Sequence, residues 1–203
     1  MSRFSQAISE GDGISVIPSL HGDVAALAAA SESAGAEAIA VATAADAATA
    51  RGASALPVVV RGPLAVREGL EGIQASGADA FVLEYENADG DGVLEALVED
   101  AQQADIDCLL DVGDEEELER ALERVDPDIV FITQQRGASE EEALERTLDL
   151  LPDVPAGKLV VAESGHVSRE QVLALERAGV DALVVRIPAS PDFGDAVRDL
   201  VER

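Results

Sequence analysis

The segment "VVAESGHVSREQV", residues 160–172, places an acidic residue directly after an apolar run and directly before a Ser-Gly turn. In a barrel of alternating parallel strands and helices, the carboxyl ends of the strands meet around one mouth. We therefore predict that Glu163 ends a buried strand and points into a central cavity, within reach of an arginine from a neighbouring strand. Ser164 and Gly165 would then let the chain turn toward a helix that starts near Ser168.

Other polar residues also stand at, or just past, the ends of predicted strands. They are Ser19, His21, Thr43, Arg61, Glu84, Glu86, Asp111, Gln134, Gln135, Arg136, His166 and Arg186. The three arginines of this set, gathered at one mouth, would attract a small anion such as a phosphate ester. Alternatively, they pair with the acidic residues of the same mouth, and the sequence leaves both interpretations open.

Metal and serine-hydrolase chemistry find little support. His21 and His166 have acidic neighbours, but the chain contains no H-x-x-x-H, no His-rich tract and no cysteine cluster, so we predict no metal and no cofactor. "ESGHV" is not the G-x-S-x-G of a nucleophilic serine. The single cysteine, Cys108, lies in the apolar "IDCLLDV" and is predicted to be a buried small hydrophobe in a reducing compartment.

The elements that must position these residues follow a repeated phrase. "AGAEAIAVAT" (34–43), "SGADAFVLEY" (76–85) and "AGVDALVVRI" (178–187) each contain a glycine that can cap a helix, an acidic residue and an apolar run typical of strands buried on both faces. Strands are predicted at 14–18, 37–42, 57–61, 79–84, 106–112, 128–132, 158–163 and 181–186. Helices are predicted at 23–34, 45–51, 64–76, 91–104, 114–125, 139–150, 168–178 and 192–202.

Eight alternations of strand and helix favour a compact α/β fold, a (β/α)8 TIM barrel that forms a single domain over residues 1–203. The alternative is an open flavodoxin-like or Rossmann-like sheet. No G-x-G-x-x-G follows the first predicted strand, and no G-x-x-x-x-G-K-[ST] occurs anywhere, so the barrel is preferred.

Charge excludes some classes of partner. The chain has 41 Asp and Glu against 14 Lys and Arg, for a net charge of −27, so its field repels nucleic acid. Lysine is nearly absent and aromatic residues make up 2%, a composition that resembles proteins of extreme halophiles; we predict that the fold weakens in dilute buffer. No apolar run is long enough to span a bilayer and the first residues lack the order of a secretory signal, so we expect a soluble cytoplasmic protein.

Several motifs resemble one family in order and spacing. "LPVVVRGPL", "GADAFVLEYE", "IDCLLDVGDEEELERAL", "DIVFITQQR" and "KLVVAESGHVSREQVLALERAGVDALVV" resemble the third to eighth strands of indole-3-glycerol-phosphate synthase, a tryptophan-pathway enzyme that closes an indole ring with loss of carbon dioxide. The resemblance covers residues 56–187 and is most specific in "VAESGHVSREQV", where the family has V-A-E-S-G-I and a helix start.

The resemblance implies roles for particular residues. It suggests a catalytic set of Glu163, Asp111 and Arg61, with Asp111 in place of a family glutamate and Arg61 in place of a lysine that acts as general acid. It also suggests a substrate-binding set at the same mouth, comprising Gln134, Arg136, Ser164, Gly165 and Arg186. The expected ligand is a phosphorylated or anionic small molecule.

The departures from the family pattern are as informative. Gly62 stands where the family has an aspartate, the first-strand E-x-K would fall near Ile17 and Ser19, and the G-x-S after the eighth strand is replaced from Arg186 onward by "RIP". The only lysine, Lys158, is predicted at the opposite end of the barrel, and a guanidinium does not readily release a proton. With a short first loop, "SLHGD", and no counterpart of the family's N-terminal extension, we expect an open site.

Two functional hypotheses follow. In the first, the chain is an enzyme that acts on a phosphorylated metabolite, in which the retained E-S-G turn and the arginines do the work. In the second, the missing lysines mark a non-catalytic relative that serves as a binding or interaction module.

Overall fold

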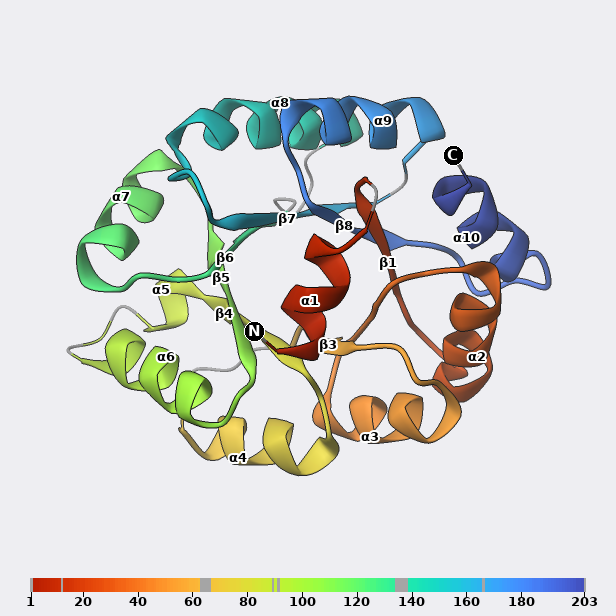
Figure 1. Ribbon diagram of the computed structural model, residues 1–203, viewed down its shortest axis with the longest axis horizontal. Coiled ribbons are helices and arrows are strands. Elements are labelled where there is room, and N and C mark those ends of the chain that lie inside the picture. The colour runs from red at the N-terminus through yellow and green to blue at the C-terminus, as the bar shows by residue number, and fades with distance from the viewer. Residues whose placement is uncertain are drawn as a thin grey trace.

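The computed structural model is a closed barrel of eight parallel strands in chain order, with helices around it (Figure 1). It describes residues 2–11, 13–62, 67–88, 90, 92–133, 139–165 and 167–202. The strands are β1 (Ser15–Ser19), β2 (Ile39–Val41), β3 (Val58–Val60), β4 (Ala80–Glu84), β5 (Asp107–Val112), β6 (Ile129–Ile132), β7 (Leu159–Ser164) and β8 (Ala182–Arg186). The ring closes where β8 pairs with β1, from Ser15 opposite Ala182 to Ser19 opposite Arg186. The predicted barrel and its eight strands are confirmed.

Helices follow the strands in alternation. They are α1 (Arg3–Ser9), α2 (Val24–Ala34), α3 (Ala44–Ala53), α4 (Arg67–Ser76), α5 (Tyr85–Ala88), α6 (Val93–Gln103), α7 (Glu115–Arg124), α8 (Glu140–Leu150), the 3-10 turn η1 (Leu151–Asp153), α9 (Arg169–Ala178) and α10 (Phe193–Val201). The eight predicted helices correspond to α2 to α4 and α6 to α10, whereas α1, α5 and η1 were not predicted. Among the described residues, no helix is long and apolar enough to cross a membrane.

Side-chain caps fix where several helices begin. Asp23, Thr43, Asp114, Ser139 and Ser168 each accept a hydrogen bond from the backbone amide three residues further on. These caps satisfy amides that have no partner within the helix. The cap at Ser168 sets the start of α9 immediately after the turn that follows Glu163.

The repeated sequence segment has the same two structural roles at more than one place: its glycine ends a helix and its acidic residue bonds to a neighbouring strand. Gly35, Gly77 and Gly179 adopt left-handed backbone with φ of 92°, 75° and 105°, so each can end a helix without the strain of a side chain. Asp79 then accepts the amide of Val58 at 2.9 Å, and Asp181 accepts the amide of Val160 at 2.7 Å. The acidic residue therefore ties the start of one strand to the strand before it.

Two apolar layers alternate along each strand. Residues such as Ile39, Val60 and Leu110 pack outward against the helices, whereas their neighbours point into the barrel. Much of the interior is small, because Ala38, Ala40, Ala80 and Ala182 lie in it.

The unpredicted helix α1 fills the amino-terminal end of the barrel. It lies across that opening in Figure 1, and Phe4 and Ile8 pack into the interior cluster with 0% and 2% exposure. The two residues are four apart and so share one face of the helix. A helix of seven residues is too short for a clear apolar period, which explains why it could not be predicted from the residue pattern.

Candidate active site at the carboxyl ends of the strands

The last inward positions, at the end of each strand or directly after it, form one layer at the barrel mouth. The alternation that points Val59, Leu109 and Val161 inward continues to a more polar set, two residues further along each strand. The set is Ser19, Ala42, Arg61, Glu84, Asp111, Thr133, Glu163 and Arg186. Six of these eight residues were predicted to lie at the mouth. Thr43, which was also predicted there, does not belong to the layer, because its side chain caps α3.

Thr133 is the polar member that the sequence prediction missed. It follows the interior residues Ile129 and Phe131 at intervals of two, so the strand period itself places it in the layer. Our prediction began the polar residues of this strand at Gln134, one position too late.

An ion pair crosses the mouth from β3 to β7. Arg61 donates from Nη2 to Glu163 Oε2, and the side chains are 32% and 9% exposed. Glu163 thus points inward toward an arginine, as predicted. The prediction of a neighbouring strand is wrong, because β3 pairs with β2 and β4 whereas β7 pairs with β6 and β8. The long Arg61 side chain reaches a strand on the other side of the ring.

The surroundings of Arg61 fix its position. Its guanidinium carbon lies 5.9 Å from the centre of the Phe131 ring, a cation–π arrangement, and its Nη2 also donates to Thr133 Oγ1 at 3.1 Å. A side chain at the next residue, Gly62, would place its Cβ 2.3 Å from the carbonyl oxygen of Ala42. Only glycine therefore lets the end of β3 lie this close to the end of β2.

Asp111 is the most deeply buried acid of the mouth. It is 8% exposed, and its Oδ1 finds no hydrogen-bond partner among the residues that the structure describes. Burial raises the pKa of Asp111 to about 7; the charge of Arg61 opposes this, Glu84 and Glu163 add to it, and a backbone hydrogen bond from Thr133 opposes it. A carboxyl group in this state can carry a proton near neutral pH.

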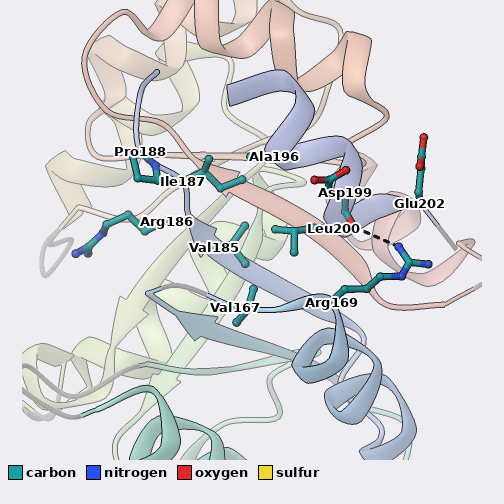
Figure 2. Close-up of a pocket in the computed structure, with 10 residues that line it drawn as sticks. All are labelled: Val167, Arg169, Val185, Arg186, Ile187, Pro188, Ala196, Asp199, Leu200 and Glu202. Carbon is teal, nitrogen blue, oxygen red and sulfur yellow. Dashed lines mark hydrogen bonds between the residues drawn. The ribbon is translucent and has the colours of Figure 1, made fainter. Parts of the chain in front are cut away.

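Arg186 ends β8 with its side chain exposed. Its guanidinium has no hydrogen-bond or ion-pair partner within the described part of the chain, so the side-chain charge is available to a ligand. Figure 2 shows the side chain extending away from Leu200 and Arg169. Beside it lies an open groove of about 660 Å³, lined by Val167, Val185, Ile187, Pro188 and Leu200 among others. The groove exists because α10 packs chiefly on α2 and β1 and only lightly on α9.

The remaining predicted binding residues divide into two groups. Ser164 is buried and follows Glu163, so alternation turns its side chain toward α8 and α9, away from the mouth. Gly165 accepts the amide of Arg186 at 3.2 Å and extends the pairing of β7 with β8. Gln134, Gln135, Arg136 and His166 lie outside the described residues.

The described part of the mouth therefore does not contain the predicted cluster of unpaired arginines that would attract an anion. Glu163 takes up the charge of Arg61, which is the alternative that the sequence left open, and Arg186 alone keeps an unpaired guanidinium there. Glu84 accepts from Asn87 of α5, and Ser19 Oγ lies 3.3 Å from His21 Nε2. No group of three or more potential metal-binding side chains gathers within the described ranges.

Two residues assigned elsewhere lie at the amino-terminal end. Lys158 pairs there with Asp126, as its predicted position requires. Cys108 is partly exposed, which corrects the prediction of a buried residue, and it lines a cavity with Ser5 and Asp107. Loss of surrounding water, with the charge of Asp107, raises the pKa of Cys108 to about 12, so the thiol stays protonated.

The fold and its mouth define a (β/α)8 barrel with a charged site at the carboxyl ends of the strands. A solved structure with the same fold is the N-acetylmannosamine-6-phosphate 2-epimerase from Clostridium perfringens, with a TM-score of 0.69, 16% identity, and coverage of 85% of this chain and 86% of that one. The family model for indole-3-glycerol phosphate synthase matches residues 17–200. The chain belongs to this family.

Curated relatives agree with that assignment. The chain is 39% identical over 129 residues to the indole-3-glycerol phosphate synthase of Acidithiobacillus ferrooxidans, which covers 63% of this chain and 48% of that protein. It is 38% identical over 121 residues to the enzyme of Verminephrobacter eiseniae, covering 55% and 42%. The aligned part thus spans about half the length of the curated relatives.

Proposed function

We propose that this chain binds a phosphorylated or otherwise anionic small metabolite at the barrel mouth and acts on it as a carbon–carbon lyase of the indole-3-glycerol phosphate synthase type, in tryptophan biosynthesis in the cytoplasm. The observation that carries the proposal is the layer of charged side chains from β3, β4, β5, β7 and β8. These groups converge where barrels of this class hold their ligands.

The residues suggest a division of tasks. Arg186, with its free guanidinium, would bind the anionic group of the ligand through charge-assisted hydrogen bonds. Asp111 and Glu163 are the carboxyl groups available for acid and base chemistry, whereas Arg61 is held by Glu163 and does not release a proton readily. The ring closure of the family therefore has to proceed here without a lysine, since Lys158 pairs with Asp126 at the far end.

A second function is favoured by a specific observation. The cation that stands in place of the family's lysine, Arg61, is already neutralised within the protein by Glu163. A site whose polar groups satisfy one another in this way would suit a non-catalytic binding module as well as an enzyme.

Isothermal titration calorimetry in molar KCl tests the binding that both functions require, and an assay for product formation then separates them. The ligands are indole-3-glycerol phosphate, its precursor carboxyphenylamino-deoxyribulose phosphate, and inorganic phosphate. We expect both esters to bind, and Arg186→Ala to weaken their binding about tenfold, the effect of losing one charge-assisted hydrogen bond.

The matched control is Arg177→Ala, which removes the same charge from an exposed site in the last turn of α9. It should leave the affinity unchanged. Formation of the indole product from the bound precursor would support the enzyme, and binding without turnover would support the module. If neither ester binds, the metabolite proposal is wrong in both forms.

A further inference from the structure

Thr133 stands at the centre of the hydrogen bonds that cross the mouth. Its hydroxyl oxygen lies 3.1 Å from Arg61 Nη2 and 3.0 Å from Glu163 Oε2. Its backbone amide bonds to the carboxylate of Asp111. Thr133, directly after β6, therefore contacts side chains at the ends of β3, β5 and β7.

The direction of these hydrogen bonds is fixed by chemistry. A guanidinium has donors only, so Thr133 Oγ1 accepts from Arg61 and must give its own proton to Glu163. Glu163 Oε2 then receives two donors, one from Thr133 and one from Arg61. The three side chains therefore form a closed set of hydrogen bonds in which Arg61 is committed to Glu163.

Asp111 lies just outside this closed set. Its Oδ1 is buried and has no partner among the described residues, although Arg61 is near enough for its charge to act on the carboxyl group. If the Thr133 hydroxyl were absent, Arg61 would lose one of the two acceptors that hold Nη2. The unpartnered Oδ1 of Asp111 would then compete with Glu163 for a hydrogen bond from the Arg61 guanidinium.

We propose that Thr133 is a positioning residue that commits Arg61 to Glu163 and thereby leaves Asp111 as the group that holds the exchangeable proton of the mouth. The raised pKa of Asp111, about 7, agrees with this arrangement. The charged and titratable groups around that carboxyl are Glu84 from β4, Arg61 from β3 and Glu163 from β7, with Arg186 and His21 completing the described mouth.

The consequence for function rests on the proposed function above. A protonated Asp111 can donate a hydrogen bond from its carboxyl group to a ligand oxygen, or transfer that proton to the oxygen and become a carboxylate. The acid role that the family gives to a lysine on the third strand would thus fall to a carboxyl group on the fifth.

The direct test is a titration of the side-chain carboxyl carbons by NMR, in ligand-free protein and molar KCl. In the wild type one resonance, removed by Asp111→Asn, should titrate near pH 7. Thr133→Val keeps the shape of the side chain but removes the hydroxyl, and it should move that midpoint below about 6 as Arg61 turns to Asp111. Thr133→Ser, the matched control, keeps the hydroxyl and should keep the midpoint.

Glu163→Gln is the positive control, because it removes a negative charge that itself raises the pKa of Asp111 and should lower the midpoint whether or not Arg61 moves. An unchanged midpoint in Thr133→Val overturns the inference, as does a Ser variant that shifts as far as the Val variant. An Asp111 that titrates in the ordinary acidic range in the wild type also overturns it. Since the titration needs no ligand, its result is independent of the calorimetry that tests the proposed function.

Discussion

At the amino-terminal end of the barrel, acidic side chains bond to neighbouring backbone, whereas at the carboxyl-terminal end Asp111 keeps an oxygen without a described partner. Asp79 accepts from Val58 and Asp181 from Val160, while Asp107 accepts the amide of Ser5 at 2.8 Å and the hydroxyl of Ser2. The last pair of contacts ties α1 to β5. Ser15 Oγ is an exception at this end, because it is buried and has no hydrogen-bond partner among the residues that the structure describes.

The two ends of the barrel differ in whether their buried polar groups have partners, and this difference separates contacts for stability from groups for function. A buried polar group without a partner costs free energy of folding, and it is kept where a ligand can complete its bonding. At the amino-terminal end, α1 closes the barrel and carboxylates accept backbone hydrogen bonds, and these contacts stabilise the closed ring of strands. At the carboxyl-terminal end, Asp111 Oδ1 and Arg61 Nε are buried without a hydrogen-bond partner in the described ranges.

Salt should have the largest effect, because it acts on the surface shared by both ends. With a net charge of −27, the folded chain repels itself unless ions screen it. We expect the melting temperature to rise on the order of 10 °C between dilute buffer and molar KCl. Thermal melts followed by circular dichroism measure it, and identical melts in both buffers would remove the halophile-like interpretation.

Removal of the Phe4 side chain should destabilise the closed end strongly. The ring is fully buried against small interior residues, so Phe4→Ala leaves a cavity and should lower the free energy of unfolding by about 3 kcal/mol. Urea unfolding in molar KCl measures the loss. The control is Leu148→Ala, at a side chain 38% exposed, with an expected change below about 0.5 kcal/mol. Similar losses in both variants would mean that α1 does not pack as described.

Replacing Asp111, at the carboxyl-terminal end of the barrel, with a neutral residue should stabilise the folded protein, but only at higher pH. A carboxyl group whose pKa is raised by folding binds more protons in the native state, so its contribution to stability falls as pH rises from about 4 through about 7. Asp111→Asn removes this loss. The variant should therefore exceed the wild type by ~2 kcal/mol near pH 8 and by much less near pH 5.

Urea unfolding at both pH values in molar KCl measures this difference. Salt screens surface acids but has little access to Asp111, so the effect should persist there. A difference between variant and wild type that does not change with pH would contradict the assigned burial of Asp111 and weaken the contrast between the two ends.

Much of the framework was accessible from the sequence. Strands buried on both faces leave continuous apolar runs, and helix caps and left-handed glycines such as Gly35 and Gly179 leave local signals, so the eight strands and eight principal helices could be predicted. The inward direction of Glu163 followed from its place at a strand end. Helix α1 could not be predicted, because seven residues carry too little pattern.

The site was predicted less completely, for physical reasons. Residue type and spacing identified Arg61, Asp111 and Glu163 as members of the mouth, since each ends an apolar strand. They could not show that Arg61 pairs across the ring, because that contact joins residues 102 apart in the chain. Nor could they show that Thr133 links the pair, or that Ser164 turns away from the mouth.

The sequence by itself determined the local elements, the closed alternation and the family, because these depend on periodicity, capping and motifs carried by contiguous residues. Only the tertiary structure decided which guanidinium is neutralised, which carboxyl oxygen is left bare and which end of the barrel is filled. Those outcomes depend on distances between strands brought together by ring closure, and no run of neighbouring residues encodes such a distance.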